Sequence, residues 1–75
     1  MNPLVKHTTD YIIRSLRLTD NSVWYLLSLR TNDYMHLGSD NVVHQTNRLI
    51  AHNVLLHSSV EEAELAYCTW LLSHQ

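Results

Sequence analysis

Residues 59–73 read SVEEAELAYCTWLLS, and this stretch decides the fold at the C-terminal end of the chain. Ser59 is a favoured helix N-cap residue, and Glu62 follows it by three positions, which is the capping-box pattern. The glutamates that open the stretch complement the positive end of a helix dipole. The pattern predicts an α-helix over residues 60–73.

This predicted helix is apolar on two sides. At roughly 100° per residue, one stripe collects the residues that suit packing against a sheet, namely Val60, Ala63, Tyr67, Trp70 and Leu71. Leu65, Cys68 and Leu72 fall on the opposite side, with Glu61 among them. A few exposed apolar residues are normal on any surface, but small domains also complete their cores by association. Leu65, Cys68 and Leu72 are therefore the candidate protein-interface residues.

The sequence before this helix is typical of strands. Residues 11–18 and 23–30 contain Tyr, Ile, Val and Trp, and turn-forming residues separate them at 19–22. A second turn at 31–33 leads into residues 34–37. This order predicts a three-stranded antiparallel meander over residues 11–37. The same apolar positions also fit helical spacing, so an all-α four-helix domain is the alternative.

The remaining segments are less regular. Ser39 or Asp40 can cap a weak helix near residues 41–51, where Asn, Thr and Val lower the helix propensity. Residues 53–57 are typical of a short strand, and we expect the polar residues 1–9 to be loosely ordered.

Together these elements predict a single α+β domain over residues 1–75. Its small antiparallel sheet has three to four strands, from residues 11–37 and about 53–57, and packs against the C-terminal helix.

Composition excludes several classes of protein. Of the 75 residues, 45% are hydrophobic and 16% are charged, with one Gly and one Pro, so the chain is neither disordered nor collagen-like. The longest apolar run, Val23–Leu27, is too short for a transmembrane helix, and the charges in the first 25 residues do not fit a signal peptide. One cysteine, Cys68, favours a reducing compartment. We expect a soluble cytoplasmic domain.

Motifs for catalysis or metal binding are missing from the sequence. The six histidines do not form the close ligand pairs of a zinc site, and Cys68 lies deep in the predicted helix, where a thiolate gains no stabilisation. A chain with one Gly cannot build a phosphate-binding loop, and no G-x-S-x-G motif occurs. We expect no enzymatic activity, no cofactor and no metal.

These observations favour a non-catalytic protein-binding module, such as a small regulator, inhibitor or accessory subunit. We expect it to form a homodimer through the C-terminal helix or a sheet edge. Strands followed by a capped helix are common among small accessory proteins of phages and mobile elements, although no diagnostic motif identifies a family.

The alternative is a nucleic-acid-binding regulator that uses Arg14, Arg17 and Arg30 with Tyr25, because sheet aromatics beside arginines can stack bases. Five basic residues in a chain of net charge −2 make nucleic acid the less favoured partner.

Overall fold

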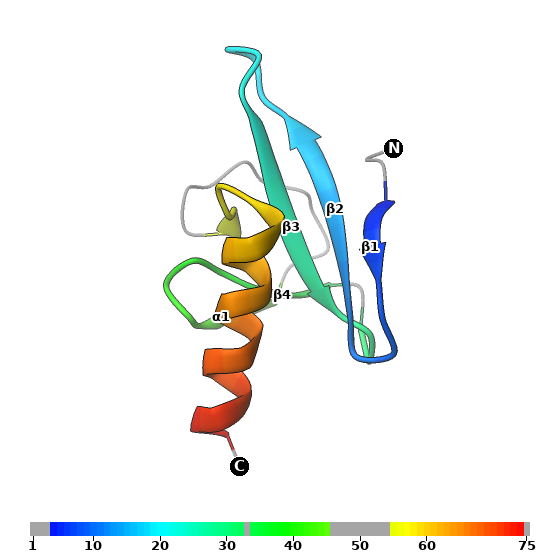
Figure 1. The fold of residues 1–75 in the computed structure, drawn as a ribbon, viewed down its shortest axis with the longest axis vertical. Helices are drawn as coiled ribbons and strands as arrows, with labels where there is room; N and C mark the ends of the chain where they lie inside the picture. The colour runs from blue at the N-terminus through cyan, green and yellow to red at the C-terminus, as the bar shows by residue number, and fades with distance from the viewer. Residues whose placement is uncertain (1–3, 33, 46–54, 75) are drawn as a thin grey trace.

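The computed structural model describes residues 4–32, 34–45 and 55–74. Within these residues the elements are β1 (Leu4–His7), β2 (Tyr11–Arg17), β3 (Val23–Leu29), β4 (Met35–Leu37), β5 (Val43–Gln45) and α1 (Val60–Ser73). The strands form one antiparallel sheet in the order β1-β2-β3-β4-β5. Helix α1 lies against one face of this sheet (Figure 1). The α+β fold and the helix over residues 60–73 are confirmed, and the all-α alternative is excluded.

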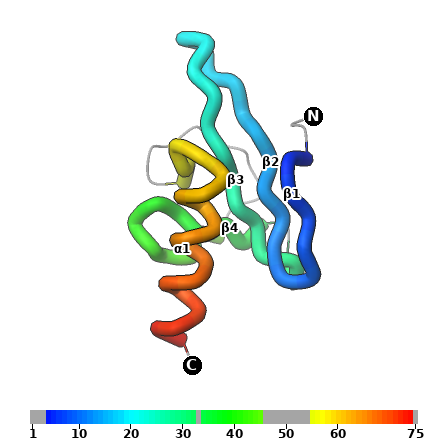
Figure 2. Tube along the Cα trace, viewed as in Figure 1, coloured from blue at the N-terminus to red at the C-terminus, as the bar shows by residue number. Residues whose placement is uncertain are grey.

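The β2–β3 hairpin is the centre of the sheet. Its register runs from Tyr11 opposite Leu29 to Arg17 opposite Val23. Asn21 in the connecting turn has a φ of 71°, a left-handed conformation that Asn tolerates better than most residues. The hairpin tip extends well beyond the helix (Figure 2). Because β4 then pairs with β3, the predicted meander over residues 11–37 is confirmed.

The main core lies between the sheet and α1. Its buried residues are Ile13, Leu27, Leu29, Leu37 and Ala63. Tyr67 of α1 packs against Tyr11 of β2, with ring centroids 4.7 Å apart, and Trp70 follows one turn later. The helix positions predicted to face the sheet do so, except for Leu71. Leu71 is 45% exposed because the last turns of α1 extend past the end of the sheet (Figure 1).

A second, smaller cluster covers the other face of the sheet. Leu26, Leu55 and Leu56 are buried there, and the residues packed around them are Leu16, Leu18 and Trp24. Side chains alternate between the two faces along a strand, so β3 supplies Leu27 and Leu29 to the main core and Leu26 to this cluster. Burial on both faces explains why the strand ends in an uninterrupted buried run over residues 26–29.

The structure differs from the expected loose order of residues 1–9 at Leu4–His7, which form strand β1 and pair with β2. Residues 1–3 lie outside the described residues. All of its side chains are exposed, so backbone pairing, rather than a hydrophobic pattern, places it in the sheet. Lys6 adds an ion pair with Glu64 of α1. A short, exposed edge strand of this kind gives little signal in the sequence.

The weak helix predicted near residues 41–51 is not formed at residues 41–45, the part of it that the structure describes. Val43–Gln45 is β5, paired with β4, while residues 46–51 lie outside the described residues. Asn41 has a φ of 62°, and the Gly38 amide donates to the Val42 carbonyl oxygen, so the chain turns back along β4. Strand pairing here overrides a helix propensity that was already low.

Within residues 55–57, the described part of the strand expected at about residues 53–57, one position is bridged to the sheet. Residues 53 and 54 lie outside the described residues, and His57 forms an isolated antiparallel bridge with Tyr25 of β3. The described residues therefore contain five strands, instead of the three or four predicted. His57 pairs with β3 along the same edge as β4.

Candidate functional site

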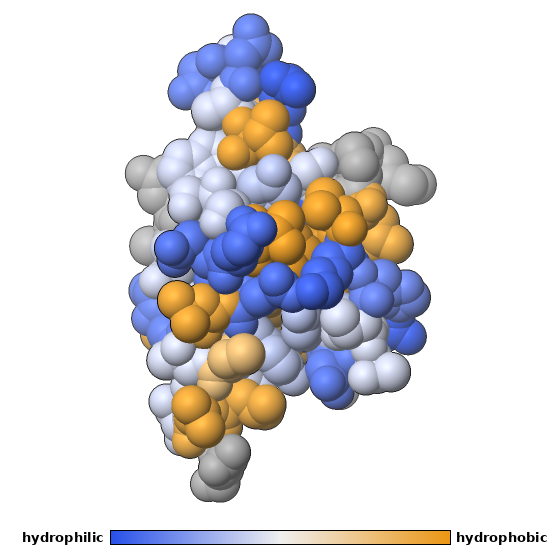
Figure 3. Space-filling view, viewed as in Figure 1, coloured by the Kyte–Doolittle hydropathy of each residue, from blue (hydrophilic) through white to orange (hydrophobic). Residues whose placement is uncertain are grey.

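The side of α1 that faces solvent exposes two leucine side chains beside a groove. Leu65 is 60% exposed and Leu72 is 70% exposed, and Cys68 and Thr69 are exposed between them. We call these four residues the outer face of α1. Hydrophobic residues gather along the lower half of the helix in the space-filling view (Figure 3). The structure therefore brings the predicted interface residues Leu65, Cys68 and Leu72 together on one exposed surface.

The position of this face follows from how the helix is held. The Ser59 hydroxyl accepts a hydrogen bond from the Glu62 amide at 3.1 Å, which caps the N-terminus as the sequence predicts. Ala63 is fully buried against the sheet. Leu72 is nine positions beyond Ala63, and at roughly 100° per residue it points in the opposite direction. Burying Ala63 therefore forces the two leucines outward.

Polar contacts fix the rotation of α1 on the sheet. Glu64 accepts hydrogen bonds from Lys6 of β1 and from the Tyr11 hydroxyl of β2, the latter at 2.9 Å. On the other side, the Asn41 side-chain amide donates to the Ala66 carbonyl oxygen at 3.0 Å. Hydrogen bonds therefore hold α1 on both sides, and the outer face between them is left exposed.

These contacts also change the ionisation of the groups involved. The hydrogen bonds from Lys6 and Tyr11 lower the pKa of Glu64, and the hydrogen bond to Glu64 raises the pKa of Lys6. Burial, together with the same hydrogen bond, raises the pKa of Tyr11. The Glu64 carboxylate is therefore bound by side chains of the sheet. Glu61 and Glu62, in contrast, are exposed in the first turn of α1.

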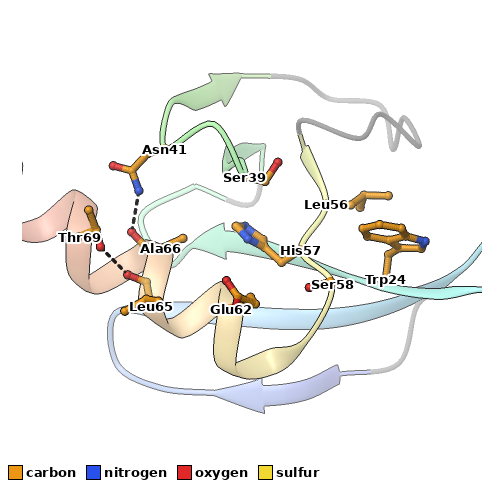
Figure 4. Close-up of a pocket in the computed structure, with 10 residues that line it drawn as sticks. All are labelled: Trp24, Ser39, Asn41, Leu56, His57, Ser58, Glu62, Leu65, Ala66 and Thr69. Atoms are coloured by element: carbon orange, nitrogen blue, oxygen red, sulfur yellow. Dashed lines mark hydrogen bonds between the residues drawn. The ribbon is translucent and has the colours of Figure 1, made fainter.

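An open groove of about 470 Å³ borders the outer face. One wall comes from α1, and the other comes from the β4–β5 turn and the segment that precedes α1 (Figure 4). The lining residues are Trp24, Ser39, Asn41, Leu56, His57, Ser58, Glu62, Leu65, Ala66 and Thr69. Leu65 and Thr69 belong to both the groove and the outer face, so the two features form one continuous surface. Sequence reasoning missed this groove because its walls meet only in the folded chain.

A sheet edge is the other predicted route to a partner, and β1 is one of the two edge strands. Leu4 and Val5 are 54% and 46% exposed on this strand. The register between β1 and β2 shifts between Leu4 and Lys6, and Lys6 carries a charge on the same strand. Irregular pairing and an edge lysine are two devices by which natural sheets resist strand addition. This edge is a poorer docking surface than α1.

The residues of the nucleic-acid alternative do not share a surface. Arg14 lies opposite Leu26, on the sheet face away from α1, while Tyr25 packs in the core beneath α1. Arg17 and Arg30 lie at opposite ends of the hairpin, since Arg17 pairs with the first residue of β3 and Arg30 follows the last. A strand of this length separates them by roughly 20 Å. The structure does not bring these four residues together.

Two buried histidines make contacts that the sequence did not indicate. His36 Nδ1 lies 3.0 Å from the Ser28 hydroxyl, and His57 Nε2 donates to the Leu37 carbonyl oxygen at 2.8 Å. Ser28 has no exposed surface, so a substrate cannot reach its hydroxyl in this structure. Only the strand register, which places Ser28 opposite His36, could have revealed the pair. Both histidines act as internal polar contacts of the sheet.

Within residues 4–32, 34–45 and 55–74, no group of three or more His, Cys, Asp or Glu side chains is placed to hold a metal ion. Across the same part of the chain, no helix combines the length and the apolar character needed to cross a membrane.

Comparisons of the chain with protein-family models, with curated proteins and with solved structures give no match. The function has to be inferred from the residues and their geometry.

Proposed function

We propose that this protein is a non-catalytic protein-binding module that self-associates through the outer face of α1. The observation that carries the proposal is the exposure of Leu65 and Leu72 directly opposite the buried side of the helix. A helix at the surface of a monomer usually presents charged or polar residues at these positions. Here the most outward positions are leucines.

The energetics favour covering this face. Fully burying a leucine side chain contributes about 1.5–3 kcal/mol relative to leaving it in water. Leu65 and Leu72 retain most of that free energy for a partner, because 60% and 70% of their surfaces are exposed. The adjoining groove gives the partner a concave surface beside the two leucines. An apolar ridge beside a groove is a form that protein interfaces commonly take.

The outer face of α1 is also a better docking surface than the β1 edge. The β1 edge exposes Leu4 and Val5 but combines an irregular register with Lys6. The outer face of α1 has no charged residue among its four members. A module of this size that acts by contact alone suits a small regulator, inhibitor or accessory subunit. The exposed thiol of Cys68 suits a reducing, cytoplasmic setting.

The proposal is tested by a pair of double variants with equal added charge. One carries Leu65→Glu and Leu72→Glu on α1, and the other carries Leu4→Glu and Val5→Glu on β1. Sedimentation velocity should show a dimer for the wild type and for the β1 variant, and a monomer for the α1 variant. Far-UV circular dichroism establishes that each variant is folded. A folded α1 variant that still dimerises like the wild type would refute the proposal.

A further inference from the structure

We propose that the groove beside α1 binds an arginine side chain presented by a segment of a different protein. The site lies between the first turns of α1 and the β4–β5 turn, and it uses Glu62, Asn41 and His57 (Figure 4). It goes beyond the proposed function, which concerns the outer face of α1. Three features of the described residues support the site: the hydrogen-bonding atoms that the groove leaves unpaired, the charge of its walls, and its apolar ends.

The hydrogen-bond donors of the groove are engaged within the protein. The Asn41 side-chain amide and the Thr69 hydroxyl donate to carbonyl oxygens of α1. His57 Nε2 donates to a carbonyl oxygen of β4, and the Trp24 indole donates to the Ser22 hydroxyl. The donor–acceptor distances are 2.8–3.0 Å. A ligand that accepts hydrogen bonds therefore finds these donors occupied.

Three acceptors of the groove, in contrast, have no hydrogen-bond partner in the part of the chain that the structure describes. The Glu62 carboxylate forms no ion pair there, and Glu62 bonds to Ser59 through its backbone amide. Asn41 uses its amide nitrogen and leaves Oδ1 unpaired. Because His57 Nε2 donates, Nδ1 of the neutral ring carries a lone pair, which is also unpaired. The groove is therefore suited to a ligand that donates several hydrogen bonds.

His57 places one of these acceptors inside the protein. Its side chain is 3% exposed, yet it lines the groove, and Figure 4 shows the ring between the β4–β5 turn and α1. Among the described residues, no buried side-chain nitrogen or oxygen lacks a hydrogen-bond partner. The unpaired Nδ1 atom is therefore accessible, and the groove is the opening that His57 lines. The Glu62 side chain points from α1 toward this ring, so a donor between them can reach both.

The walls of the groove are acidic. The two segments that form them, residues 34–45 and 55–74, contain four acidic residues and no lysine or arginine. Among the described lining residues, Glu62 alone is charged. An anion would meet Glu61 and Glu62 in the first turn of α1, where they offset the positive end of the helix dipole. Charge complementarity therefore selects a cation.

An arginine side chain fits these atoms better than a lysine ammonium. A guanidinium presents five N–H donors in one plane and accepts no hydrogen bond, so it can donate to several acceptors at once. Trp24 and Leu56 lie at one end of the groove, and Leu65 and Ala66 lie toward the other (Figure 4). These apolar side chains can cover the methylene groups of the arginine.

The size of the groove fits a segment of a protein. Its volume of about 470 Å³ lies within the range of about 300–1,000 Å³ that ligand sites occupy. This volume leaves room for an arginine together with its apolar neighbours. Arginine is enriched in protein interfaces, whereas the phosphates of a nucleic acid would be repelled by Glu62.

An NMR titration of the full-length chain tests the site. The probe is an acetylated and amidated pentapeptide with one arginine between two leucines and an alanine at each end. Two control peptides replace the arginine by citrulline, which keeps its shape without the charge, or by glutamate. At millimolar concentration, the arginine peptide should cause saturable shifts of the Trp24 indole signal and of the Asn41 and Glu62 amide signals. The citrulline peptide should bind several-fold more weakly, and the glutamate peptide should cause no saturable shift.

A matched pair of variants locates the interaction. Glu62→Gln and Glu61→Gln remove the same charge from the same turn, but only Glu62 lines the groove. Glutamine at position 62 also keeps the capping-box pattern. Glu62→Gln should weaken binding of the arginine peptide several-fold, and Glu61→Gln should bind it like the wild type. Equal losses in the two variants would overturn the site, as would equal affinity for the arginine and citrulline peptides or binding of the glutamate peptide.

A third variant separates this site from self-association. Leu72 lies outside the groove lining, so Leu72→Gln keeps the site while it weakens the outer face of α1. The titration is repeated on this variant, in which a second copy does not cover the groove. If neither protein shows saturable shifts, the arginine site is overturned, whatever the mass of the wild type. A monomeric wild type that binds the arginine peptide would refute self-association and support the site.

Discussion

Ala63 and Leu72 lie on opposite sides of α1, and their environments are reversed relative to their sizes. Ala63, the smaller residue, has no exposed surface, whereas Leu72 is 70% exposed. A leucine at position 72 adds nothing to the core between α1 and the sheet. Ala63 therefore packs α1 on the sheet, whereas Leu72 lies on the side of α1 that a partner can contact.

Substitutions at these two positions should therefore have different effects on stability. Ala63→Leu overpacks a filled site and should lower the free energy of unfolding by about 1–3 kcal/mol. Leu72→Gln should change it by less than about 0.5 kcal/mol, as expected for a surface position. Urea denaturation followed by tryptophan fluorescence measures both, at a protein concentration low enough to exclude dimerisation. A loss at Leu72 as large as that at Ala63 would mean that Leu72 stabilises the monomer.

The core contact between β3 and α1 should be the most sensitive to truncation. Leu27 is fully buried in the main core. Leu27→Ala should lower the free energy of unfolding by about 2–5 kcal/mol, because it removes buried methyl groups and leaves a cavity. Val5→Ala on the exposed β1 strand is the control, with an expected change of less than about 0.5 kcal/mol. Similar values for the two variants would contradict the assigned core.

The helix N-cap provides a third test. Ser59→Ala removes the acceptor for the Glu62 amide and should lower the free energy of unfolding by about 1 kcal/mol. Ser59→Asp keeps an acceptor at this position and should retain most of the stability. Ser58→Ala, next to the cap and exposed, serves as the control. If Ser59→Ala and Ser58→Ala unfold at the same urea concentration, the cap does not stabilise α1.

The Glu64 contacts predict a pH dependence of stability. The hydrogen bonds from Lys6 and Tyr11 lower the pKa of Glu64 below its ordinary value of 4.5. The unfolded chain therefore binds more protons at this group than the folded chain, so the stabilisation is present above pH 4.5 and is lost as the pH falls below it. Glu64→Gln should have a smaller loss of thermal stability in that acidic range than the wild type. Parallel curves for the two proteins would contradict this role of Glu64.

The parts of the fold that were predicted correctly are those with a strong local pattern. The Ser59 cap and the apolar stripe fixed α1 at residues 60–73, and turn residues between aromatic and branched runs located the β2–β3 hairpin. The same helical periodicity identified Leu65, Cys68 and Leu72 as exposed, because a helix with one buried stripe leaves the opposite positions outside.

The parts that were missed depend on contacts between distant residues. β1 is held by its backbone pairing with β2, and β5 forms because Asn41 turns the chain back along β4. The groove and the Ser28–His36 contact also require segments that meet only after folding. Leu71 was placed wrongly because periodicity gives a direction on the helix but not the point at which the sheet ends.

Light scattering of the wild-type protein after size exclusion, over a range of protein concentrations, is the first measurement to make. If the outer face of α1 binds a second copy, the mass should rise from 8.8 kDa at high dilution toward twice that value as the concentration increases. A mass of 8.8 kDa at every concentration would contradict self-association through Leu65 and Leu72.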